Sequence, residues 1–256
     1  RDVRDSAMVL SLLTGRDKRD ATSLPKSCDD FTRGLGKGVK GLTVALPKEF
    51  FGEGLDSEVK RAILAAAETF ERLGANVKEV SMPSMSHALE AYYIISSAEA
   101  SSNLARFDGV RYGYRAEGYE DMAELYRRSR SEGFGAEVKR RILLGTFVLS
   151  AGYVDAYYKQ ALKMRTRIKE EFDTVFHSAS FLLTPVAPTR AYRLGEKVTD
   201  PLQMYLGDVY TVPVNIAGLP ALSMPCGTGE GGMPVGMQLI GPAFSEAMLY
   251  RVGYAF

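Results

Sequence analysis

The sequence predicts an α/β fold in which a mixed, twisted sheet is flanked by helices. Residues 42–46 alternate like a strand, residues 56–73 have helical apolar spacing, and residues 77–80 read as a second strand. A strand, a helix and a strand within about forty residues indicate a right-handed crossover onto a parallel neighbour. Residues 221–226 and 234–240 read as two further strands joined by the turn TGEGG. This second pattern predicts an antiparallel hairpin that closes one side of the sheet.

The N-terminal elements follow from apolar spacing and from stop residues. Apolar positions at helical intervals predict a helix over 3–13, ended near Gly15, and the polar residues 16–33 form a surface connection. Residues 36–41 spell GKGVKG, which satisfies the GxGxxG pattern but precedes a strand instead of following one. A dinucleotide site requires the opposite order, so we interpret this segment as a flexible entry into strand 42–46.

Asp56 or Ser57 can cap the helix that follows this strand, and Gly74 suits its left-handed end. Farther along, residues 87–106 predict a helix whose small residues at 96–102 allow another backbone to approach closely. The segment that follows, 106–115, reads RFDGVRYGYR. It could be a nucleic-acid platform, but a structural cluster fits better because no further basic residues lie nearby.

Residues 116–134 alternate in charge and predict a solvated helix or loop, while 138–149 predict an apolar helix. Arg141 lies next to core-facing positions of this second helix. A guanidinium so close to an apolar face either extends its head to water or binds an acid. A longer helix is expected over 153–176, then a short buried strand at 181–183.

The segment 207–227 is apolar but interrupted by three prolines, so neither a long helix nor a long regular strand fits it. We expect a buried, irregular wall with Asp208 at the edge of a pocket. A short helix starting at Asp200-Pro201 leads toward Asp208, and Ser245 is expected to cap a final helix.

Composition excludes several classes of function. The 256 residues are 46% hydrophobic and 25% charged, as in ordinary globular proteins, and the net charge of +1 gives no electrostatic footprint for nucleic acid or an anionic membrane. No stretch approaches the roughly 20 apolar residues of a membrane span. Cys28 and Cys226 are far apart, and no acid cluster has metal-ligand spacing around His87 or His177. We therefore predict neither a disulfide scaffold nor a metal site.

Several segments together resemble the amidase signature family of serine amidases. They read RFDGVRYGYR, VKRRILLGTFVLSAGYVDAYYKQA, LLTPVAPTRA, DPLQMYLGDVYTVPVNIAGLPALSMPCG and PVGMQLIGPAF. Within the family, RFDGVRYGYR and KRRILLGTF are similar to the A subunits of glutamyl-tRNA(Gln)/aspartyl-tRNA(Asn) amidotransferases. The resemblance spans nearly the whole chain. It implies the amidase signature fold, with residues 1–256 as the C-terminal portion of a single amidase domain.

The resemblance implies a catalytic set of a Ser nucleophile, a second Ser with a cis peptide bond, and a Lys. In the family the nucleophile lies in a Gly/Ser-rich segment upstream of the helix with which this sequence starts. The chain begins without Met and contains no Gly-Gly-Ser-Ser-Gly-like run. We therefore expect a piece of a longer protein without the catalytic residues, which is inactive by itself.

What the resemblance assigns to this sequence is recognition of glutamine. Arg141 matches the family position that binds the α-carboxylate, Asp208 the one that binds the α-ammonium, and Tyr92 a neighbouring contact, with Tyr93 possible after a slip of one residue. An Arg fork suits a carboxylate because it donates two parallel hydrogen bonds. The alternative from the residues alone is a structural salt bridge between Arg141 and Asp208.

The expected partners also come from the resemblance. The complete glutaminase would hydrolyse glutamine and pass ammonia to the B subunit of the amidotransferase, which would bind the misacylated tRNA and hold ATP and Mg²⁺, with the C subunit completing the complex. No cofactor is expected in this chain, and the location would be the cytoplasm or an organellar matrix. The alternatives are another amidase-family hydrolase of small amides, or a noncatalytic amidase-like binding or scaffold fragment.

Overall fold

The computed structural model describes residues 2–26, 30–192, 194 and 201–256, with the backbone alone at 201–203. The predictions for Cys28 and Asp200 therefore lie outside the described residues. The chain divides into two compact units, of which the first comprises Arg1–Ser86 with Ile168–Phe256 and the second His87–Arg167. Each unit is described by itself. That residues 1–256 belong to a single amidase domain remains a prediction.

Unit 1 contains a five-stranded mixed sheet of β1 (Thr43–Pro47), β2 (Asn76–Val80), β3 (Phe181–Pro185), β4 (Ala221–Thr228) and β5 (Pro234–Ile240). The strand order is β2-β1-β3-β5-β4. β1 pairs in parallel with β2 and β3, and β5 pairs antiparallel with β3 and β4. Both topological predictions, the parallel crossover and the antiparallel hairpin, are confirmed.

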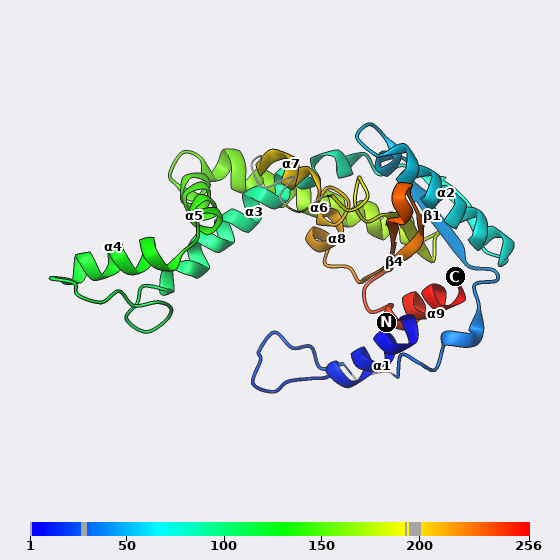
Figure 1. The fold of residues 1–256 in the computed structure, drawn as a ribbon, viewed down its shortest axis with the longest axis horizontal. Coiled ribbons are helices and arrows are strands. Elements are labelled where there is room, and N and C mark those ends of the chain that lie inside the picture. Colours follow the sequence, from blue (N-terminus) through cyan, green and yellow to red (C-terminus); the bar gives the residue numbers. More distant parts are fainter. Residues whose placement is uncertain (1, 27–29, 193, 195–200) are drawn as a thin grey trace. The chain divides into compact units, whose positions relative to one another are not determined.

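The crossover helix α2 (Ser57–Arg72) covers one face of this sheet (Figure 1). Asp56 caps it, because its carboxylate accepts a hydrogen bond from the backbone N–H of Glu58 at 3.1 Å. Gly74 follows the helix with φ of +92°, as its predicted role requires. The helix and the sheet bury one core, formed by Val59, Ile63, Ala66, Phe70, Phe181, Leu183, Met237 and Leu239 among others.

The remaining helices of unit 1 include α1 (Val3–Leu13) and α9 (Glu246–Ala255), which pack on each other, and the short α7 (Pro201–Leu206) and α8 (Val212–Ala217). The prediction that the Ser245 side chain caps α9 is wrong. Its Oγ is buried and has no hydrogen-bond partner among the described residues. The reason is its backbone, at φ −101° and ψ 21°, which is not the extended conformation from which an N-cap side chain reaches back.

Unit 2 is helical and contains α3 (Ala88–Asn103), α4 (Met122–Gly133) and α5 (Ala136–Leu149). A π-helical turn, Val154–Tyr158, leads into α6 (Lys159–Phe176), within which the two units divide. α3 and α5 pack so closely that a Cβ added at Gly145 would overlap with the backbone carbonyl of Ser97. The prediction that the small residues of α3 admit another backbone is therefore confirmed.

Short 3-10 turns complete the described secondary structure, at Leu35–Lys37, Lys48–Phe51, Pro83–His87, Leu104–Arg106 and Glu230–Gly232.

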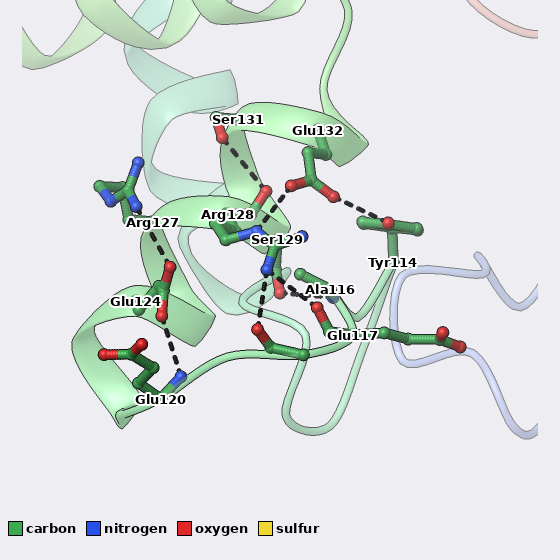
Figure 2. A network of polar contacts seen from close by, with 11 residues as sticks. Tyr114, Ala116, Glu117, Glu120, Glu124, Arg127, Arg128, Ser129, Ser131 and Glu132 are labelled. Atoms are coloured by element: carbon green, nitrogen blue, oxygen red, sulfur yellow. Dashed lines mark hydrogen bonds and ion pairs between the residues drawn. The ribbon is translucent and has the colours of Figure 1, made fainter.

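The arginine-rich and tyrosine-rich connection before α4 folds back onto that helix (Figure 2). Arg128 donates to the carbonyl oxygens of Glu117 and Gly118 and, through Nε, to Glu132 at 2.9 Å. Tyr114 donates its hydroxyl hydrogen to the same Glu132 at 2.8 Å. These bonds hold a loop to its helix, which agrees with the structural interpretation of this segment.

Candidate functional site

Arg141 lies on α5 with its side chain 28% exposed. Its Nε donates to the Glu137 carboxylate, one helical turn earlier, at 3.0 Å, and its guanidinium lies 5.3 Å from the centre of the Tyr93 ring. Partial burial disfavours the charged form, but hydrogen bonds with Tyr92 and Glu137 outweigh it and raise the pKa of Arg141. Within unit 2 the guanidinium therefore has an acid partner, and it is held in place as a permanent cation.

Tyr92 and Tyr93 both lie on α3, partly buried, with ring centres 5.1 Å apart in an edge-to-face arrangement. The resemblance indicated Tyr92, with Tyr93 possible after a slip of one residue, and the structure places both against Arg141 in different ways. The hydroxyl oxygen of Tyr92 accepts a hydrogen bond from the guanidinium, whereas Tyr93 presents its ring face. Two of the three predicted substrate contacts, Arg141 and Tyr92, are thus brought together.

Asp208 lies in unit 1, in the turn between α7 and α8. The turn is tight, because the Asp208 carbonyl accepts hydrogen bonds from the backbone N–H groups of Thr211 at 3.1 Å and Val212 at 3.0 Å. Its carboxylate is exposed and, among the described residues, has no hydrogen-bond or ion-pair partner. The meeting of Asp208 with Arg141 and Tyr92 in one site remains a prediction from the resemblance.

Asp208 lines a pocket of about 260 Å³ whose other wall is the loop 187–192 that follows β3. On the other side of the Asp208 turn, residues 212–217 are buried apart from Asn215. The prediction that Asp208 lies at the edge of a pocket is confirmed, but the predicted irregular wall is wrong in part, because residues 212–217 form the helix α8 and residues 221–228 the half-exposed strand β4.

A second pocket, of about 360 Å³, shares Pro188, Thr189 and Gly207 with the first and is lined by Glu49 and Tyr210. Ser81 donates to Oε1 of Glu49 at 2.7 Å, while Oε2 is buried and has no hydrogen-bond partner among the described residues. Burial alone would raise the pKa of Glu49, but hydrogen bonds from Ser81 and the backbone N–H of Met82 lower it. The second pocket therefore contains an ionised carboxylate that sequence reasoning missed.

An ion-pair cluster fastens the loop wall of the Asp208 pocket. Arg190 donates to Glu58, at the start of α2, at 2.8 Å and to Glu230, in the β4–β5 turn, at 3.0 Å. Glu58 also accepts from the backbone N–H of Glu230 at 2.8 Å. The hydrogen bond to Glu230 and the charge of Glu58 raise the pKa of Arg190. The loop is thereby fixed to α2 and to the hairpin.

Among the described residues, no group of three His, Cys, Asp or Glu side chains is arranged to hold a metal ion. None of the helices in the described ranges is long and apolar enough to cross a membrane.

Comparison with known proteins gives consistent results. A family model described as Amidase matches residues 1–250. The A subunit of the glutamyl-tRNA(Gln) amidotransferase of Staphylococcus epidermidis is 54% identical over all 256 residues, which correspond to 53% of that protein. The crystal structure of the corresponding A subunit from Thermotoga maritima superposes with a TM-score of 0.77 at 36% identity, covering 99% of this chain and 50% of that one.

A bacterial aryl acylamidase of the amidase signature family shares only the fold, with a TM-score of 0.76 at 23% identity over 100% of this chain and 51% of its own. The predicted fold class, a mixed sheet flanked by helices as in amidase signature enzymes, is confirmed. The chain spans about half the length of the curated relatives it matches.

Proposed function

The chain belongs to the amidase family, and from this premise we propose that it forms the glutamine-binding part of the glutaminase component of a tRNA-dependent amidotransferase. The observation that carries the proposal is the 54% identity, over the whole chain, to a protein named as the A subunit of such an enzyme. The arrangement of Arg141, Tyr92 and Asp208 within their units supports it.

Free glutamine is a zwitterion, so an enzyme that selects it needs a cation for the α-carboxylate and an anion for the α-ammonium, both away from the reacting amide. Arg141 is suited to the first role, because Glu137 and Tyr92 order its guanidinium before a ligand arrives. Asp208 is suited to the second, because it lines a pocket, is exposed, and is not neutralised by a described neighbour.

The reaction proposed for the whole protein is acyl transfer. A serine attacks the side-chain amide of glutamine, a second serine and a lysine relay the proton, ammonia leaves, and water then hydrolyses the acyl-enzyme. We assign none of these three groups to a residue of this sequence. Ammonia would pass to a partner, the B subunit, that holds the misacylated tRNA, ATP and Mg²⁺, with the C subunit in the same complex, in the cytoplasm or an organellar matrix.

The proposal is tested by Asp208→Asn in the full-length protein that contains this sequence. Loss of one member of a charge pair should weaken glutamine binding by about 2–5 kcal/mol, and KM for glutamine should rise accordingly. Asp173→Asn is the matched control, since Asp173 is an exposed acid of α6 paired with Lys169, and it should leave KM unchanged.

An unchanged KM in Asp208→Asn would contradict the assignment of Asp208. Equal use of acetamide and glutamine would favour a general small-amide hydrolase, and absence of any turnover would favour a noncatalytic scaffold.

A further inference from the structure

A buried polar side chain interrupts the apolar strand β5. Gln238 of β5 is 2% exposed and lies between Met237 and Leu239, both fully buried. Burying a side-chain amide costs free energy unless it is hydrogen-bonded, whereas a Met of similar size would cost nothing of this kind. Packing alone therefore does not explain why a glutamine occupies this buried position.

The amide of Gln238 bonds to two separate segments of the chain. Its Nε2 donates to the carbonyl oxygen of Pro185 at 3.1 Å and to that of Tyr210 at 2.7 Å. A carboxamide nitrogen carries two hydrogens and can serve two acceptors at once. A Glu carboxylate in the same place could donate to neither, and a Met thioether has no hydrogen to donate.

These two carbonyls lie in the chain next to the two walls of the Asp208 pocket. Pro185 ends β3, and the loop that follows it supplies residues 187–192 of the pocket. Tyr210 lies two residues after Asp208, inside the turn closed by hydrogen bonds from Thr211 and Val212 to the Asp208 carbonyl. Because that turn is tight, fixing the Tyr210 carbonyl also fixes the backbone that carries the Asp208 carboxylate.

The loop wall is anchored elsewhere as well. The backbone N–H of Asp56 donates to the Pro188 carbonyl at 2.9 Å, and Arg190 binds Glu58 and Glu230. For the Asp208 turn, the hydrogen bond from Gln238 is a direct link to the sheet. Gln238 is therefore hydrogen-bonded to the backbone of both segments, the one that leads into the loop 187–192 and the one that carries Asp208.

We infer that Gln238 is a positioning residue that sets where the Asp208 carboxylate stands relative to the loop 187–192, and so sets the affinity of the pocket for an α-ammonium group. The inference rests on the proposed function of Asp208 and adds a residue outside the predicted substrate contacts.

The test is Gln238→Met in the full-length protein, with glutamine as substrate. A misplaced binding group should raise KM roughly 10-fold to 100-fold with a smaller change in kcat. Ile63→Val, in the core between α2 and the sheet, is the matched control for a loss of stability alone. It should lower Tm but leave KM unchanged.

A second measurement separates positioning from a structural role. Adding Gln238→Met to Asp208→Asn should leave KM where Asp208→Asn alone puts it, since no carboxylate remains to be positioned. The inference would be overturned if Gln238→Met raised KM by the same factor with and without Asp208→Asn, or if Gln238→Met alone did not raise KM. Either result would leave the proposed role of Asp208 untouched. If Asp208→Asn itself leaves KM unchanged, the proposed function and this inference both fail.

Should Gln238→Met not fold, Gln238→Asn replaces it in both backgrounds. Asn keeps the amide but is one methylene shorter and cannot span both carbonyls. The same rise in KM, again confined to the background with Asp208 intact, supports the inference, and an unchanged KM overturns it.

Discussion

Among the described residues, the guanidinium of Arg141 is contacted by Glu137, Tyr92 and Tyr93. Glu137 gives a charge-assisted hydrogen bond, Tyr92 a hydrogen bond and Tyr93 the face of its ring. From the residues alone, this arginine either extends its head to water or binds an acid, and the acid considered was Asp208. The structure shows Glu137 as its partner, four residues away on the same helix, a spacing that favours such pairs. The tyrosines lie on another helix, so only the resemblance indicated them.

Cys226 allows a prediction about pH. Burial raises the pKa of its thiol to about 11, compared with about 8.5 for an exposed cysteine. Between these values the unfolded chain loses the proton while the folded chain keeps it, so this group lowers the stability of the fold as pH rises through that window.

In a Cys28→Ser variant, in which Cys226 is the remaining cysteine, we expect the rate of alkylation by iodoacetamide to keep rising with pH up to pH 10. A rate that levels off near pH 9 would show an ordinary thiol and contradict this prediction.

The roles of Glu49, which lines a pocket, and of Gln238, which lies buried in β5, were not predicted from the sequence, and the reasons differ. Glu49 lies in the short 3-10 turn after β1, and only the fold shows that one of its oxygens is buried. Gln238 did leave a signal, since a polar residue stood in an apolar strand pattern. Its significance depends on where the carbonyls of Pro185 and Tyr210 lie, which no sequence pattern encodes.

At the scale of elements, those helices and strands were predicted whose own sequence has a clear apolar periodicity and clear end residues. The α2 helix and the β4–β5 hairpin have strong periodicity and clear stop residues, and both were predicted closely. The segment that forms α4 alternates acidic and basic residues, so helix and loop remained equally possible until the structure showed Met122–Gly133. In α8, Val212 and Pro213 begin a six-residue helix that was expected only as an irregular wall.

The crossing of α3 and α5 gives a prediction about stability. In Gly145→Ala the new Cβ would meet the carbonyl of Ser97, so the helices must separate. We expect the free energy of unfolding to fall by about 1–3 kcal/mol, as for other overpacked sites. Gly36→Ala is the control, because it adds the same atom where nothing lies within 4 Å. Equal urea midpoints for the two variants would show that the crossing is looser than described.

At the scale of the whole molecule, the sequence predicted the parallel crossover and the antiparallel hairpin of unit 1, because strands, helices and turns alternate regularly there, but not the pairings of β3 with β1 and β5. It did not predict the division into two compact units. That division depends on how densely each segment contacts the rest, and α6 runs through the boundary without any break in its sequence pattern.

A whole-molecule prediction concerns activity. No residue of this sequence is assigned to the Ser, Ser and Lys of the family, so we expect the 256-residue chain alone to release no ammonia from glutamine. The full-length protein that contains the sequence should do so under the same assay. Turnover by the isolated chain at a comparable rate would place the nucleophile within these residues.

The most direct measurement of the central claim compares three amides in the full-length protein. Glutaramate lacks the α-ammonium of glutamine, and 4-aminobutanamide lacks its α-carboxylate. Asp208→Asn should reduce the preference for glutamine over glutaramate by at least about tenfold and keep the preference over 4-aminobutanamide, and Arg141→Met should do the reverse. If neither substitution changes either preference, these two residues do not bind the two ends of the amino acid.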